Sequence, residues 1–97
     1  MRFDWDERKA SANRIKHGVA LEVAITAFDD PWALVAPDPR HSSASEERTW
    51  LIGESDSGVL VVVFTVRESG DVTRLISARR ANRRERKRYE ESKGISV

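Results

Sequence analysis

The chain has 97 residues, of which 34% are charged and 39% are hydrophobic, and its formal net charge is +1. This length fits one small domain, and the absence of cysteine excludes disulfides and cysteine-ligated metal sites. No apolar run approaches the roughly 18 residues of a membrane-spanning helix, and the N-terminus lacks the apolar core of a signal peptide. We therefore expect one cytoplasmic domain with no membrane contact.

Positive charge is concentrated near the C-terminus. Segment 74–93 holds nine of the 17 basic residues but only three of the 16 acidic ones, so it carries +6 and the rest carries −5. This asymmetry favours a polyanionic partner, and nucleic acid is the commonest polyanion.

Two helices are predicted in the N-terminal third. Asp6 suits the N-cap position of a helix over residues 7–17, and Gly18 suits its C-terminal end. A second helix is predicted over residues 21–28, although its start lacks a side chain that accepts hydrogen bonds.

Four strands are predicted to follow. The third reads VLVVVFTV, and this apolar, β-branched composition predicts a central strand that is buried on both faces. Short turns at 55–58 and 68–71 favour hairpins over parallel crossovers. The strands are expected over residues 32–36, 49–53, 59–66 and 72–79.

The last strand leads into a basic helix. Strict alternation along this strand places Leu75 and Ala78 on opposite faces. Asn82 and Glu85 have the spacing of a capping box, which predicts a helix over residues 83–93. The fold class is therefore α+β: two N-terminal helices, a four-stranded, mostly antiparallel meander sheet, and a C-terminal helix.

Three separated segments resemble the BrnT family, the toxin half of a bacterial type II toxin–antitoxin pair. They are FDWDERKASANRIKHGVALEVAITAFDDP, PDPRHSSASEERTWLIG and RLISARRANRRERKRYE. The resemblance implies a fold similar to the RelE-like ribonucleases and RNA cleavage that inhibits translation. It also implies a BrnA-type antitoxin with a ribbon-helix-helix part, so that operator DNA is bound only through the antitoxin.

RNA hydrolysis needs no metal or other cofactor, because the ribose 2′-OH can attack the neighbouring phosphate. The protein then supplies a base, a cation for the phosphate and an acid for the leaving 5′-oxygen. Arg79, where strand becomes helix, is the first candidate for the cation; the alternative is a solvated or salt-bridged arginine. Arg67 is a further candidate that could face the same cleft. His17 and His41 lack metal-ligand spacing, so no metal is expected.

The acid–base candidates each have a structural alternative. His17 is a candidate because imidazole is the side chain suited to proton transfer near neutral pH, but it also suits the C-terminal end of its helix. Lys9, on the same helix face, could bind phosphate or pair with a nearby acid, and His41 could serve as the acid–base group or form a loop hydrogen bond. The residues alone do not rank Lys9, His17, His41 and Arg79.

The C-terminal helix offers further candidates. Glu85 is a possible general base, although the capping box explains it, and Tyr89 suits an anchor to the sheet better than a catalytic phenol. The tryptophans could stack on bases, but core packing is the better expectation for those near strands. The expected RNA-binding residues are Arg80, Arg83, Arg84, Arg86, Lys87 and Arg88. The alternative function is a non-catalytic nucleic-acid-binding or interaction subunit of a repressor complex.

Overall fold

A computed structural model describes residues 2–40, 42–67 and 70–94 of the chain. None of the described helices is long and apolar enough to cross a membrane. The elements in chain order are β1 (Arg2–Asp4), α1 (Glu7–His17), α2 (Leu21–Ala24), the 3₁₀ helix η1 (Ile25–Asp29), β2 (Leu34–Pro37), β3 (Thr49–Ser55), β4 (Gly58–Arg67), β5 (Val72–Arg80) and α3 (Arg83–Ser92).

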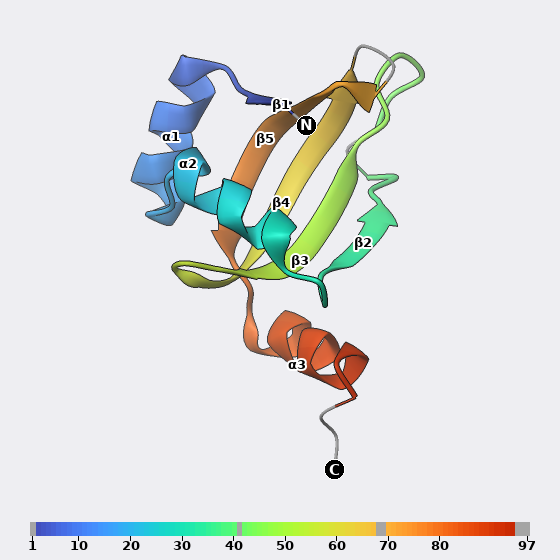
Figure 1. Cartoon of the computed structure of the whole chain (residues 1–97). Coiled ribbons are helices and arrows are strands. Elements are labelled where there is room, and N and C mark those ends of the chain that lie inside the picture. Colours follow the sequence, from blue (N-terminus) through green and yellow to red (C-terminus); the bar gives the residue numbers. More distant parts are fainter. Residues whose placement is uncertain (1, 41, 68–69, 95–97) are drawn as a thin grey trace.

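The sheet has five strands in the order β1-β5-β4-β3-β2 (Figure 1). The α+β class, the four predicted strands and the central position of β4 are confirmed. Strands β2 to β5 form the predicted antiparallel meander. The predicted number of four strands is wrong, because β1 adds a fifth strand parallel to β5 and makes the sheet mixed. The sequence RFD gives no strand signal, since Phe3 is its only apolar residue.

One face of the sheet, the helix face, is covered by α1, α2 and η1 (Figure 1). The predicted second helix is an α-helix for only four residues and then tightens into η1. Gly53 of β3 explains this close packing: a Cβ at Gly53 would lie 2.9 Å from the carbonyl oxygen of Ala27 in η1. A residue without a side chain is therefore needed where η1 crosses β3.

The β4–β5 register shifts between Val63 and Phe64, as at a β-bulge. Phe64 pairs with Leu75, while Val63 pairs with Ser77, so one residue of β5 is extra. Leu75 and Ala78 consequently both join the core of the helix face. The predicted strict alternation along this strand is wrong, because the extra residue at the bulge shifts by one position which side chains face each side of the sheet.

Asn13 connects α1 to the edge of β5 beyond the short β1. Its side chain accepts from the backbone N–H of Ala78 (3.1 Å) and donates to the carbonyl oxygens of Ala78 (2.9 Å) and Val19 (3.0 Å). The amide is buried, so it satisfies backbone groups that water does not reach. Asn13 thereby fixes α1 beside the C-terminal half of β5.

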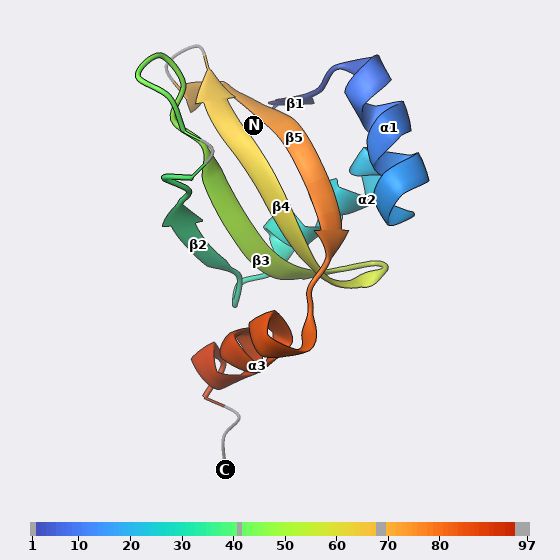
Figure 2. The same ribbon diagram turned by 180° about the vertical axis from the view of Figure 1, so that it is seen from behind.

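Helix α3 lies at one end of the sheet rather than over it (Figure 2). The predicted capping box of Asn82 and Glu85 is confirmed, and the helix ends one residue early, with Lys93 as its C-cap. Tyr89 is fully buried and its hydroxyl donates to the carboxylate of Asp30, which follows η1. The predicted anchoring role of Tyr89 is therefore confirmed.

Candidate functional site

Among the described helices, only α3 adjoins the other face of the sheet, the open face, and it does so at one end (Figure 2). A cleft of about 460 Å³ lies on this face, between α1 and α3. Strand register arranges its floor in two rows. One row is Trp50, Val63 and Ser77; the next is Ile52, Val61 and Arg79.

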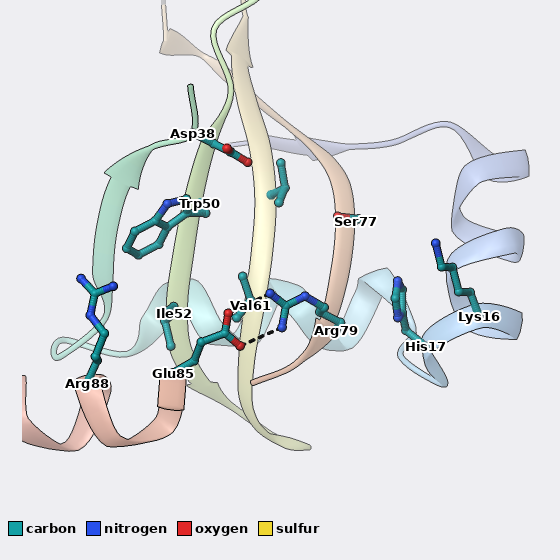
Figure 3. Close-up of a pocket in the computed structure, with 11 residues that line it drawn as sticks. Lys16, His17, Asp38, Trp50, Ile52, Val61, Ser77, Arg79, Glu85 and Arg88 are labelled. Atoms are coloured by element: carbon teal, nitrogen blue, oxygen red, sulfur yellow. Dashed lines mark hydrogen bonds and ion pairs between the residues drawn. The ribbon is translucent and has the colours of Figure 1, made fainter. Parts of the chain in front are cut away.

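Arg79 projects into the cleft from the end of β5 and forms a two-point ion pair with Glu85 of α3 (Figure 3). Arg79 Nη1 and Nη2 donate to Glu85 Oε1 and Oε2, each at 2.8 Å. These hydrogen bonds raise the pKa of Arg79 and lower the pKa of Glu85. Arg79 Nη1 also donates to the carbonyl oxygen of Arg80 (3.4 Å). The cleft therefore contains a fixed guanidinium whose Nε–H and second Nη2 N–H remain available to an anion.

Glu85 is held in this position by the start of α3. The backbone N–H of Asn82 donates to Glu85 Oε1 (2.9 Å), and Asn82 Oδ1 accepts from the backbone N–H of Glu85 (2.8 Å). The capping interpretation is therefore confirmed, and the same carboxylate also orients Arg79. Because its pKa is lowered, Glu85 is a weak proton acceptor at neutral pH.

The last turn of α1 forms the opposite wall of the cleft. Lys16 and His17 line it there, and His17 and Arg79 line the same cleft from different elements (Figure 3). Lys9 lies about two turns further back, in a smaller hollow that shares Lys16 and His17 with the cleft. The structure thus brings His17 and Arg79 together and leaves Lys9 at the margin.

The predicted RNA-binding residues lie mostly outside the cleft. Arg88 lines it on the α3 side. Arg80 donates to the carbonyl oxygen of Ser57 (2.7 Å), and Arg86 donates to that of Ala81 (3.2 Å). Every one of these side chains is exposed, which suits a steering surface for a polyanion: Arg80, Arg83, Arg84, Arg86, Lys87 and Arg88.

Arg67 does not line the cleft of Arg79. The two arginines lie at opposite ends of the β4–β5 pair, where Arg67 pairs with Val72. Arg67 faces a separate hollow and contacts Glu46 (3.2 Å). Glu46 has a lowered pKa, chiefly because Arg48 donates a hydrogen bond to it. The prediction that Arg67 faces the same cleft is therefore wrong. Residues an even number of positions apart along β4 share a sheet face, but Arg67 lies too far along the strand to reach the cleft.

Tyr89 also lies outside the cleft. Burial and the hydrogen bond to Asp30 raise the pKa of its hydroxyl. Burial acts to raise the pKa of Asp30, but hydrogen bonds from the backbone N–H of Glu54, from Tyr89 and from the backbone N–H of Trp32 lower it overall. Tyr89 therefore anchors α3 and is poorly placed to exchange protons with a ligand. His41, the remaining candidate, lies outside the described residues.

Sequence reasoning missed several residues of the cleft. Lys16 shares the polar face of α1 with Lys9 and His17, so helical spacing was an available signal. Trp50 was expected in the core, because a strand residue gives no indication of which sheet face stays open. Asp38 and Ser77 also line the cleft. Among residues 2–40, 42–67 and 70–94, no group of three or more His, Cys, Asp or Glu is placed to hold a metal ion.

Comparison with known families identifies the chain. The model of the family described as "Ribonuclease toxin, BrnT, of type II toxin-antitoxin system" matches residues 5–85. No curated protein sequence matches the chain. The matched segment includes α1, the β2–β5 sheet and the start of α3, and therefore the walls that carry His17, Arg79 and Glu85. The chain belongs to the BrnT family of ribonuclease toxins of type II toxin–antitoxin systems.

Proposed function

We propose that the chain is a metal-independent endoribonuclease that cuts RNA in the cleft of the open face and thereby inhibits translation in the cytoplasm. The observation that carries this proposal is the convergence of His17 and Arg79 from different elements at one cleft (Figure 3). An imidazole can move protons near neutral pH, and a fixed guanidinium stabilises a phosphate that gains charge.

In this proposal the ribose 2′-OH attacks the neighbouring phosphorus and the bond to the 5′-oxygen breaks. Arg79 binds the phosphate oxygens through its free N–H groups, and Lys16 adds a second positive charge on the α1 side. His17 acts as an acid–base group for the 2′-OH or for the leaving oxygen. The products are a 2′,3′-cyclic phosphate and a 5′-hydroxyl end, which balances the atoms of the step.

Glu85 has a positioning role in this proposal. Its two-point contact with Arg79 (2.8 Å for each oxygen) restricts the guanidinium, and its contact with the backbone of Asn82 holds the carboxylate itself. Glu85→Gln keeps an acceptor and the cap but removes the charge. A loss of cleavage of less than about tenfold supports positioning, whereas a general base would cost at least 10²-fold.

The direct test is incubation of the purified chain with single-stranded RNA in excess EDTA. We expect cleavage, with cyclic phosphate and 5′-hydroxyl ends detected by mass spectrometry. His17→Ala should reduce the rate, while Arg14→Ala, on an exposed part of the same helix, should not. Intact RNA, or cleavage that EDTA abolishes, would contradict the proposal.

Type II family membership implies a protein antitoxin. We propose that this partner is of the BrnA type, with a ribbon-helix-helix part that alone contacts operator DNA. The exposed basic side chains of α3 would serve RNA and antitoxin in turn, because complementary charge speeds association with either. Complex formation should then abolish RNA cleavage, and full activity of the bound complex would contradict this arrangement.

The exposed basic surface of α3 also fits a non-catalytic nucleic-acid-binding or interaction subunit. Such a chain would bind nucleic acid with steep salt dependence but leave RNA intact. Expression without the antitoxin distinguishes the two functions. A ribonuclease toxin arrests growth and His17→Ala relieves the arrest, whereas a binding subunit leaves growth unchanged.

A further inference from the structure

Trp50 lies in the cleft on the side away from His17 (Figure 3). The other tryptophans lie elsewhere: Trp5 packs against the core of the helix face, and Trp32 is 54% exposed but outside the cleft. Trp50 itself is half-buried, because one part of its ring packs against the cluster around Ile52. The fold therefore presents one large aromatic surface on the floor of the cleft.

Apart from its packing against the cluster around Ile52, this ring has no aromatic or hydrogen-bonding partner among the described residues. The aromatic contacts of the described residues join Phe3, Phe28 and Phe64 on the helix face and do not involve Trp50. Within the described part of the chain, the indole N–H also donates to no protein group. The ring face is thus available to a planar ligand.

Basic side chains lie on two sides of this ring and the apolar floor beside it, and the carboxylate of Asp38 also lines the cleft (Figure 3). Lys16, His17 and Arg79 lie on the α1 and β5 side, and Arg88 lies on the α3 side (Figure 3). Glu85, on the same wall, is already paired with Arg79. An aromatic surface between cationic groups is the combination that binds single-stranded nucleic acid, in which phosphates meet the charges and bases stack on the rings.

We propose that Trp50 is the stacking platform for a nucleobase of the bound RNA strand, next to the phosphate at Arg79. This inference rests on the proposed ribonuclease function and assigns its substrate a single-stranded region. Strand β4 separates Trp50 on β3 from Arg79 on β5, so their backbones are roughly 10 Å apart. An RNA strand that crosses the sheet therefore passes from the phosphate site to the ring, with Arg88 near its next phosphate.

The floor also predicts how selective this platform is. Directly between Trp50 and Arg79 it consists of Val61 and Val63, which offer no hydrogen-bonding groups to a base edge, while the polar residues Asp38 and Ser77 line the cleft beside it. Stacking tolerates every base because every base has a π-face. The platform should therefore require that a base is present and discriminate weakly among the four bases.

Binding of oligonucleotides tests the platform separately from catalysis. The probes are a fully 2′-O-methylated single-stranded oligonucleotide, which lacks the attacking hydroxyl, and an abasic oligonucleotide of the same length. Trp50→Ala should weaken binding of the first about 10- to 100-fold and leave binding of the second unchanged. Trp50→Phe should retain most of the affinity, and Trp32→Ala is the matched control.

Tryptophan fluorescence gives a second readout. The base-containing probe should quench the wild-type signal, and Trp50→Phe should lose that quenching. Melting curves establish that each variant folds, and Trp50→Leu preserves apolar contact with Ile52 if Trp50→Ala does not fold.

The platform is refuted if Trp50→Ala binds the base-containing probe as wild type does, or if it loses affinity equally for the abasic probe. It is also refuted if the substitution weakens antitoxin binding alone, since the ring would then contact the protein partner. Efficient cleavage of unmodified RNA by Trp50→Ala would overturn the platform and leave the ribonuclease intact. Failure of the wild type to cut RNA would instead overturn the proposed function.

Discussion

The two faces of the sheet use the same strands for different purposes. On the helix face, Leu60, Val62 and Phe64 of β4 pack under α1, α2 and η1 and are buried. On the open face, Val61 and Val63 of the same strand form the floor of the cleft. The apolar run of β4 therefore indicates core packing for only one of its faces, because the other face lines the cleft.

The comparison indicates where substitutions should separate stability from activity. Residues that hold elements against the helix face should change the free energy of unfolding. Residues on the open face should change cleavage or RNA binding with a smaller effect on folding. The following substitutions test this division.

The largest expected effect is on cleavage, at Arg79. Arg79→Ala removes the cleft guanidinium, and loss of one group that stabilises developing charge costs about 10²–10³ in rate. Arg79→Lys should recover part of this rate, because lysine retains the charge but not the two-point geometry. Single-turnover cleavage in EDTA measures both, with Arg14→Ala as the control. If the activity of Arg79→Ala is within twofold of wild type, RNA cleavage does not take place at the open face.

The next effect is on folding, at Asn13. Asn13→Ala leaves the buried backbone groups of Ala78 and the carbonyl of Val19 without their side-chain partner. An unsatisfied buried group costs about 1–3 kcal/mol, so unfolding in urea should occur at clearly lower concentration. Ser11→Ala, exposed on the same helix, should be neutral. Equal stability of the two variants would contradict the proposed attachment of α1 to β5.

A comparable loss of stability is expected at Gly53. Gly53→Ala places a Cβ 2.9 Å from the carbonyl oxygen of Ala27 and 3.2 Å from the Cβ of Ala33. Such overpacking costs about 1–3 kcal/mol, because η1 or β3 must move. The exposed neighbour variant Glu54→Ala is the control in the same thermal melts. If Gly53→Ala melts as wild type does, η1 does not pack on β3 as described.

The smallest effect is the pH dependence of the Arg79–Glu85 pair. The pKa of Glu85 is lowered from 4.5 by the hydrogen bonds from Arg79, so its contribution to stability is present above about pH 4.5 and is lost as pH falls below it. For a partly exposed pair this is about 1 kcal/mol or less. The stability difference between wild type and Glu85→Gln should therefore shrink on acidification. Glu91→Gln, exposed on the same helix, should show no such trend, and a growing difference would contradict the sign.

The sequence predicted the elements whose signals are local. The caps at Asp6 and Asn82 fix helix starts through neighbouring backbone groups, and the run of β4 marks the central strand. Strand β1 and the bulge near Ile76 escaped prediction, because both depend on pairing with distant residues. The bulge decides which side chains of β5 face the cleft.

The residues of the site were likewise predictable only where their signals are local in the sequence. Arg79 was identified from its place at a strand–helix junction, and Lys16 was recoverable from helical spacing. The place of Trp50 in the cleft could not be predicted, because no pattern in the sequence indicates that one sheet face lacks a covering helix. The prediction that Arg67 faces the cleft was wrong for a related reason, since the distance between Arg67 and Arg79 depends on strand register.

Methyl NMR of β4 tests the division between the faces most directly. Val61, Val62 and Val63 are consecutive but face the open side, the helix side and the open side in turn. Titration with a fully 2′-O-methylated oligonucleotide should shift the methyl signals of Val61 and Val63 and leave those of Val62 nearly unchanged. Larger shifts at Val62 than at its two neighbours would contradict binding at the open face.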